Sequence, residues 1–169
     1  MKLAALLETI PEVQTTGKLP DSIQALEYDS RRVAPDSLFI ALRGAKVDGH
    51  KFAAQAAQRG AVAVVAEEPL DLPESCALLR VPDSRAAMAD LAAVFYGQPA
   101  RQLKLLGVTG TNGKTSVAFL LRHILAAVGN RCGMIGTVEY DLGERVVPAS
   151  RTTPCLLYTS DAADELTSG

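Results

Sequence analysis

The chain has 169 residues, of which 48% are hydrophobic and 21% are charged, and its formal net charge at pH 7 is −2. This length and composition provide enough apolar surface for one ordinary domain, or for a small domain with part of a second one. Because acidic and basic residues are interspersed and no apolar run reaches the roughly 20 residues of a membrane helix, we expect a cytoplasmic protein that binds neither nucleic acid nor a membrane.

The first 98 residues alternate between helical and strand-like patterns. Helical spacing of apolar residues marks three segments: 3–10, 52–59 and the residues from Asp83 or Ser84, either of which can cap a helix, to Phe95. Apolar runs predict four strands, at 23–28, 38–42, 61–65 and 78–81. Residues 1–98 are therefore predicted to form one small α/β domain.

A second unit is predicted to begin at about residue 99, because Gly97 and Pro99 interrupt the pattern just before a new apolar run. Its predicted elements are a strand at 103–108, a glycine-rich loop, a helix from 114 to about 128, and a strand at 132–138. This order is typical of the start of a parallel α/β sheet. Gly143 further indicates a hairpin before residues 146–147.

The cysteines and histidines show no metal-ligand spacing. Cys76, Cys132 and Cys155 are far apart and odd in number, and we interpret the first two as reduced thiols in the core or on the surface. His50 and His123 each lack a second ligand at helical spacing. We therefore expect no metal site at either histidine.

The densest chemical signal is the loop Gly110-Thr111-Asn112-Gly113-Lys114-Thr115-Ser116, between a predicted strand and a predicted helix. Its glycines allow backbone N–H groups to point at phosphate oxygens, and the helix N-terminus adds partial positive charge. Lys114 supplies a full positive charge, and the Thr115 hydroxyl can bind Mg²⁺. The first glycine stands two residues later than in the standard phosphate loop. The alternative is a tight strand-to-helix turn with a surface lysine.

The segment from Gly110 to Thr115 resembles the ATP loop of the Mur ligase family, whose members join an amino acid to a carboxylate. Folylpolyglutamate synthases of the same superfamily typically have Gly where this chain has Thr115. The segments 28–44 and 48–52 resemble the UDP-binding domain of Mur ligases that act on UDP-MurNAc-dipeptide and UDP-MurNAc-tripeptide. Gly136-Thr137 with Arg151-Thr152-Thr153-Pro154 downstream resembles the branch that adds the third residue of the peptidoglycan stem peptide. The resemblance covers about residues 22–154.

The resemblance implies two domains: 1–98 is a UDP-substrate domain, and 99–154 is the truncated start of a P-loop, parallel-sheet ATP-binding domain. Ser30 would contact the uridine diphosphate part of UDP-MurNAc-L-Ala-D-Glu, and Thr152 and Thr153 would contact its muramoyl-dipeptide. The alternatives are a turn-capping hydroxyl for Ser30 and a strand-surface pair for the two threonines.

For the second domain, the resemblance implies that the residues from Gly110 to Ser116 hold ATP and that Thr115 binds Mg²⁺. Lys114 would be the catalytic residue that offsets charge on the transferring phosphoryl group. The carboxylate would form an acyl phosphate, and the amino group of an amino acid, either diaminopimelate or lysine, would displace phosphate from it.

The family's carbamylated lysine, its other metal ligands and its amino-acid-selecting domain have no place in this sequence. We therefore expect an inactive chain whose second unit leaves apolar faces uncovered. We separately expect a monomer, an expectation on which no motif bears. Two alternatives are a fragment of the D-Ala-D-Ala-adding branch, which the segment 151–154 disfavours, and a non-catalytic nucleotide-binding module.

The last stretch, residues 155–169, does not continue the family pattern. From Cys155 to Glu165 it resembles the reading-frame translation of a widely used transposase sequencing adapter. We expect this tail to be artefactual and exclude it from the fold prediction.

Overall fold

The computed structural model of the chain describes residues 1–44, 47–143 and 145–149. The chain divides into two compact units, Met1–Phe95 and a second unit that begins at Tyr96. The predictions for Thr152, Thr153 and the tail from Cys155 onward concern residues outside the described ranges, so they stay predictions.

The first unit is built on a five-stranded sheet with the order β1-β5-β4-β3-β2. Its strands are β1 Gln14–Thr16, β2 Ala25–Glu27, β3 Ser37–Ile40, β4 Ala61–Ala66 and β5 Ala77–Arg80. Neighbours from β2 to β5 run parallel, whereas β1 pairs antiparallel with β5 at the edge. The four predicted strands are confirmed, with shorter bounds for β2 and β3. β1 was not predicted, because its residues Gln-Thr-Thr are polar and exposed and show no apolar alternation.

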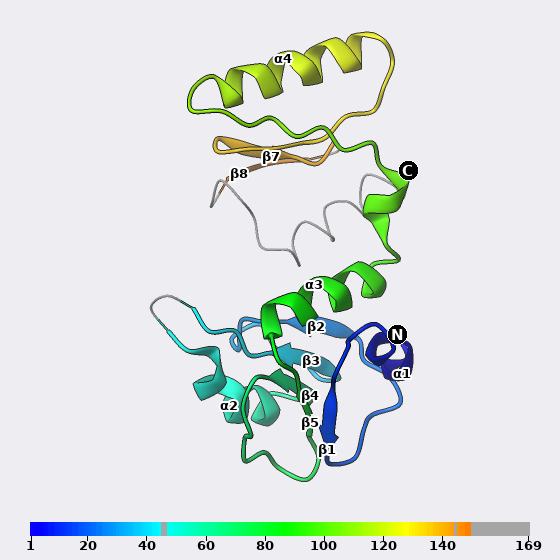
Figure 1. The fold of residues 1–169 in the computed structure, drawn as a ribbon, viewed down its shortest axis with the longest axis vertical. Coiled ribbons are helices and arrows are strands. Elements are labelled where there is room, and N and C mark those ends of the chain that lie inside the picture. Colours follow the sequence, from blue (N-terminus) through cyan, green and yellow to red (C-terminus); the bar gives the residue numbers. More distant parts are fainter. Residues whose placement is uncertain (45–46, 144, 150–169) are drawn as a thin grey trace. The chain divides into compact units, whose positions relative to one another are not determined.

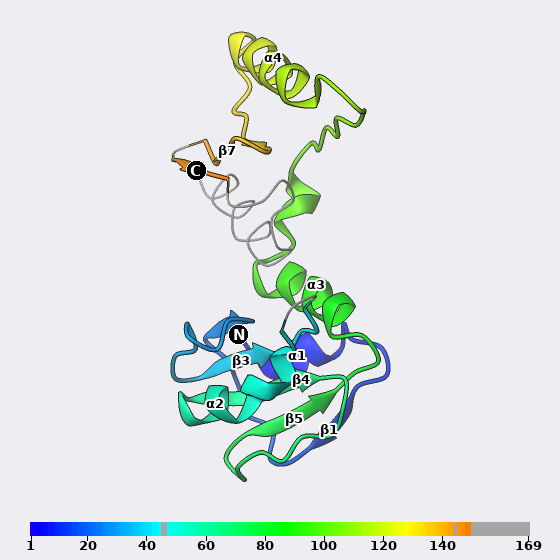
Figure 2. The same ribbon diagram turned by 90° about the vertical axis from the view of Figure 1, so that its left-hand side faces the viewer.

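Helices cover both faces of this sheet (Figures 1 and 2). They are α1 Leu3–Leu7, the 3-10 helix η1 Gly49–Phe52, α2 Ala53–Gln58 and α3 Ser84–Phe95. α2 packs against β4 on one face, and α1 contacts α3 on the other. The predicted cap of α3 is confirmed for Asp83, whose Oδ1 accepts hydrogen bonds from the backbone N–H groups of Arg85 and Ala86 at 2.8 and 2.9 Å.

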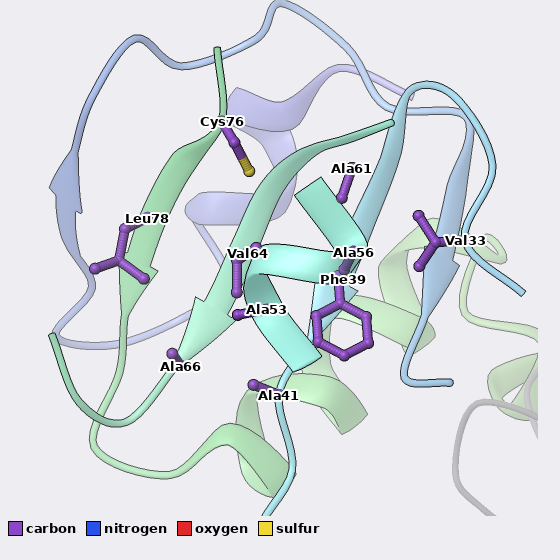
Figure 3. Close-up of a cluster of buried hydrophobic side chains, with 10 residues drawn as sticks. All are labelled: Val33, Phe39, Ala41, Ala53, Ala56, Ala61, Val64, Ala66, Cys76 and Leu78. Atoms are coloured by element: carbon purple, nitrogen blue, oxygen red, sulfur yellow. The ribbon is translucent and has the colours of Figure 1, made fainter. Parts of the chain in front are cut away.

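A cluster of buried side chains fills the space between α2 and the sheet (Figure 3). Phe39 of β3 is its largest member and is 1% exposed. The small side chains of Ala53 and Ala56 on α2 allow the helix to lie close to the strands. Cys76, directly before β5, is also buried in this cluster. The first unit therefore has a continuous apolar core of its own.

Cys76 is expected to resist alkylation while the first unit is folded. Burial raises the pKa of its thiol to about 11, so only about one thiol in a thousand is ionised at pH 8. Treatment with iodoacetamide at pH 8, followed by peptide mass spectrometry, should label the half-buried Cys132 in the native protein and Cys76 only after unfolding in urea. Equal labelling rates of both cysteines in the native protein would contradict the burial of Cys76.

The second unit contains one long helix and a small antiparallel sheet. Its elements are the 3-10 helix η2 Pro99–Gln102, α4 Lys114–Ala127, β6 Met134–Ile135, β7 Glu139–Asp141 and β8 Val146–Pro148. The strand order is β6-β7-β8, and both pairs are antiparallel. The predicted helix is confirmed, and so is the hairpin, which turns at Gly143 with φ 86°.

The predicted strand at 103–108 is wrong, because these residues form no strand in the structure. Extended backbone needs a neighbouring strand to bind its N–H and C=O groups, and no described strand pairs with this segment. Among the described residues of the second unit, the parallel pairing implied by the family resemblance is likewise not formed.

The second unit leaves much of its apolar surface uncovered, as expected from the sequence. No residue of α4 is buried, and the exposed fractions of Leu120 and Ile124 are 61% and 58%. A polar link joins α4 to the sheet: the Arg122 guanidinium pairs with the buried carboxylate of Asp141, which also accepts the backbone N–H of Gly143 at 2.9 Å. Among the residues that the structure describes, no helix has the length and apolar content needed to cross a membrane.

Candidate functional site

The carboxyl ends of four parallel strands meet at one edge of the sheet in the first unit. The segments that follow β2, β3, β4 and β5 bring polar side chains to this edge, namely Ser30, Arg43, Glu67 and Asp83. In open α/β sheets, ligands bind outside the carboxyl ends of the strands. This edge is therefore the candidate substrate site of the first unit.

Ser30 lies in the loop after β2 and is 7% exposed. Its hydroxyl donates a hydrogen bond to Oε1 of Gln55 on α2, at 3.1 Å. The guanidinium of Arg59, which follows α2, donates to the carbonyl oxygen of Arg31 at 2.9 Å. These two bonds tie the loop to the α2 segment, and the Ser30 hydroxyl binds a side chain 25 residues away rather than capping its own turn. The contact of Ser30 with uridine diphosphate stays a prediction.

Asp29 and Arg31 form a bidentate ion pair within this loop. Nε of Arg31 donates to Oδ1 of Asp29 at 2.9 Å, and its terminal nitrogen lies 2.6 Å from Oδ2. The side-chain hydrogen bond from Arg31 lowers the pKa of Asp29 to about 2. Because the Arg31 side chain is 83% exposed, this pair contributes little to stability. Its effect is that Asp29 neutralises the positive charge of Arg31 within the loop.

A pocket of about 310 Å³ opens where β3, β4 and β5 end. It is lined by Leu42, Arg43, Glu67, Pro82, Asp83 and Arg85. Arg43 pairs with Glu68 at 2.8 Å and lies 3.7 Å from Glu67, whose Oε1 accepts the backbone N–H of Ser84 at 3.1 Å. The pocket does not include Ser30. Sequence reasoning missed this cluster, because its members are far apart in the chain and no local motif marks them.

His50 joins η1 to the end of β4. Its Nε2 accepts the backbone N–H of Glu67 at 3.0 Å, so its Nδ1 has the proton and donates to Oδ1 of Asp48 at 2.6 Å. The backbone N–H of His50 is the main cause that lowers the pKa of Asp48. The carboxylates of Asp48 and Glu68 lie beside the ring, although neither stands at helical spacing from His50, and the expectation of no metal site at this histidine stays a prediction. Both ring nitrogens nevertheless serve hydrogen bonds within the protein.

In the second unit, the glycine-rich loop turns directly into α4. Gly110 and Gly113 have φ values of 147° and 75°, which favour glycine. A Cβ added to Gly113, the N-cap of α4, would meet no atom within 4 Å, so the space around this position is open. Within the part of the chain that the structure describes, the backbone N–H groups from Thr111 to Lys114 have no acceptor. Such donors at a helix N-terminus fit a phosphate group.

The side chains of the loop add a cationic and a hydroxyl group to this site. Nζ of Lys114 donates to the carbonyl oxygens of Gly110 and Thr111 at 2.6 and 3.3 Å, so the ammonium group lies over the loop. Oγ1 of Thr115 lies 3.2 Å from Oγ1 of Thr137. The loop therefore offers N–H donors and the Lys114 ammonium group to phosphate oxygens, and the Thr115 hydroxyl to a cation, which fits ATP with Mg²⁺.

Comparisons with known proteins place both units in one family. Residues 22–96 match the model described as Mur ligase family, catalytic domain, and residues 108–168 match that of the Mur ligase middle domain. The UDP-N-acetylmuramoyl-L-alanyl-D-glutamate--2,6-diaminopimelate ligase of Geobacillus thermodenitrificans is 51% identical over 155 residues, which are 91% of this chain and 31% of that protein. The Listeria monocytogenes protein of the same name is 43% identical over 172 residues, covering 100% of this chain and 34% of its own length.

Solved structures agree with these relatives. A structure of UDP-N-acetylmuramoyl-L-alanyl-D-glutamate--2,6-diaminopimelate ligase superposes with a TM-score of 0.66 at 28% identity, covering 86% of this chain and 30% of that one. MurF from Acinetobacter baumannii superposes with a TM-score of 0.57 at 28% identity, covering 88% and 29%. The chain thus spans about a third of the length of the curated relatives that it matches.

Proposed function

The chain belongs to the Mur ligase family, and we propose that it provides the UDP-substrate and ATP sites of the ligase that adds the third residue of the peptidoglycan stem peptide. The observation that carries this proposal is the loop from Gly110 to Ser116, which stands with Lys114 at the N-terminus of α4 and whose N–H groups from Thr111 to Lys114 have no acceptor among the described residues. This loop lies inside the segment that matches the Mur ligase middle domain. The relatives' names supply the substrate, UDP-MurNAc-L-Ala-D-Glu, and the added residue, 2,6-diaminopimelate.

In the proposed reaction, the substrate carboxylate takes the γ-phosphoryl group of ATP, and the amino group of the incoming amino acid then displaces phosphate to form an amide. The loop N–H groups from Thr111 to Gly113 would hold the phosphate oxygens. Lys114 would exchange its contacts with the loop carbonyls for the transferring phosphoryl group and balance its charge. A magnesium ion at Thr115 would supply further positive charge to the phosphates.

We assign residues 1–98 to the UDP-substrate domain and 99–154 to the start of the ATP-binding domain. Ser30 would contact uridine diphosphate, and Thr152 and Thr153 the muramoyl-dipeptide. The position of Ser30 at the carboxyl ends of the parallel strands supports its assignment. Because the chain spans about a third of its relatives' length, we expect the 169 residues alone to bind substrates without turning them over.

The D-Ala-D-Ala-adding branch is the weaker candidate. MurF, the structure from the D-Ala-D-Ala-adding branch, shares the fold of this chain, but its TM-score is lower than that of the third-residue ligase at the same 28% identity. The relatives with 43–51% identity bear the name of the third-residue ligase.

Ser30→Ala is expected to weaken binding of UDP-MurNAc-L-Ala-D-Glu about 3- to 10-fold, which corresponds to the loss of one hydrogen bond. Isothermal titration calorimetry of the full chain measures this change, with MgATP as the second ligand. Affinity for MgATP should not change, because Ser30 and the glycine-rich loop belong to different units. Ser75→Ala, at an exposed serine of the first unit, is the matched control and should bind both ligands normally.

The outcomes separate the role of one residue from the family function. If the unsubstituted chain binds the UDP ligand and Ser30→Ala binds it equally well, the Ser30 hydroxyl serves only Gln55. If the unsubstituted chain binds neither the UDP ligand nor MgATP, the proposed function is wrong for this chain.

A further inference from the structure

One contact in the second unit joins the glycine-rich loop to a residue that the proposed reaction has not used. Oγ1 of Thr115, in the first turn of α4, lies 3.2 Å from Oγ1 of Thr137, which is 22 residues further along the chain. Thr137 stands in the turn between β6 and β7, where the backbone N–H of Gly136 donates to the carbonyl oxygen of Glu139 at 3.2 Å. The antiparallel pairing of β6 with β7 therefore fixes where the Thr137 hydroxyl lies.

We propose that Thr137 is a positioning residue for Thr115: the Thr137 hydroxyl accepts the proton of Thr115, so that the lone pairs of Thr115 face the cation that accompanies the nucleotide. This inference rests on the proposed function, because it takes the glycine-rich loop to be a site for a nucleoside triphosphate with a divalent cation. It adds a residue from outside the loop to that site.

The proposed role follows from the hydrogen-bonding capacity of a hydroxyl group, which has one proton to donate and two acceptor lone pairs. When a lone pair binds a divalent cation, the proton must point away from the cation, and the cation makes the O–H group a stronger donor. An acceptor on the far side of the hydroxyl then stabilises the orientation that binds the cation. Among the described residues, Thr137 provides the side-chain oxygen within hydrogen-bond distance of Oγ1 of Thr115.

A purely structural role of Thr137 predicts different behaviour. In that case the hydrogen bond would only tie the β6–β7 turn to α4. Because Thr137 is exposed, water can replace its partner at little cost, and binding of ATP would change equally with and without a divalent cation. The dependence of nucleotide affinity on Mg²⁺ therefore distinguishes positioning from anchoring.

The experiment is a calorimetric titration of the full chain with ATP, once with Mg²⁺ and once with EDTA. Thr137→Val removes the hydroxyl at nearly constant shape, and Thr137→Ser keeps it. We expect Thr137→Val to reduce the gain in ATP affinity that Mg²⁺ provides by about 3- to 10-fold, the equivalent of one hydrogen bond. Affinity for metal-free ATP should remain the same, and Thr137→Ser should bind as the unsubstituted chain does.

A double substitution tests whether Thr137 acts through Thr115. Thr115→Val should itself remove most of the Mg²⁺-dependent gain, and adding Thr137→Val should then cause no further loss. Far-UV circular dichroism establishes that each variant keeps its helix content. If Thr137→Val failed to fold, the smaller side chain of Thr137→Ala would replace it in the same comparison.

Two results would overturn the inference. One is an unchanged Mg²⁺-dependent gain in Thr137→Val, which includes an equal loss of affinity with and without Mg²⁺. The other is additive losses in the double variant. If the unsubstituted chain bound ATP with no gain from Mg²⁺, the inference alone would be wrong. If it bound no ATP under either condition, the proposed function would fail together with the inference.

Discussion

Lys114→Ala is expected to weaken binding of MgATP by about 10- to 100-fold, the equivalent of charge-assisted hydrogen bonds to phosphate. The ammonium group is the one full positive charge of the loop from Gly110 to Ser116, and it already lies over the loop carbonyls. Alanine leaves the N–H donors in place but removes this charge, so binding should be weakened rather than abolished. Isothermal titration calorimetry with MgATP measures the change.

The same titration needs two comparisons. Lys104→Ala removes an exposed lysine of the second unit that lies outside the loop, and its MgATP affinity should stay normal. Binding of UDP-MurNAc-L-Ala-D-Glu by Lys114→Ala should also stay normal, because Lys114 and Ser30 lie in separate units. If Lys114→Ala lost both ligands to the same extent, the assignment of the two sites to two units would be wrong.

The strands of the first unit could be predicted from the sequence where burial produces a recognisable hydrophobic pattern in neighbouring residues. The segments 61–65 and 78–81 are buried within a parallel sheet, so they read as continuous apolar runs, and both are strands. β1 is an exposed edge strand, and its polar residues show no such pattern. The run at 103–108 has the composition of a strand but is unpaired, and composition alone does not supply a partner.

In the candidate sites, likewise, local features could be predicted from the sequence and contacts between distant residues could not. The glycine-rich loop is local, and its glycines, lysine and helix N-terminus were all predictable from adjacent residues. The contacts of Ser30 with Gln55 and of Thr115 with Thr137 join residues 25 and 22 positions apart. Such contacts depend on how strands and helices pack, which local spacing does not specify.

Phe39→Ala is expected to lower the free energy of unfolding of the first unit by about 3–5 kcal/mol, which is the usual cost of removing a buried phenyl ring. Phe39 is 1% exposed and lies in the internal strand β3, opposite Val64 of β4 and within the cluster that packs on α2 (Figure 3). Alanine at this position leaves a cavity that the short side chains of α2 cannot fill. Phe52→Ala is the matched control, because Phe52 is 39% exposed. Its substitution should lower the free energy of unfolding by less than about 1 kcal/mol.

The thiol of Cys76 provides a readout specific to the first unit, because it belongs to the same buried cluster as Phe39. Its rate of alkylation by iodoacetamide along a urea series should show unfolding of Phe39→Ala at lower urea than Phe52→Ala. Equal midpoints for the two variants would show that Phe39 is not a core residue. Under conditions that unfold the first unit of Phe39→Ala, binding of UDP-MurNAc-L-Ala-D-Glu should be lost. MgATP binding should then persist if the second unit folds independently, whereas its simultaneous loss would show that the nucleotide site requires a folded first unit.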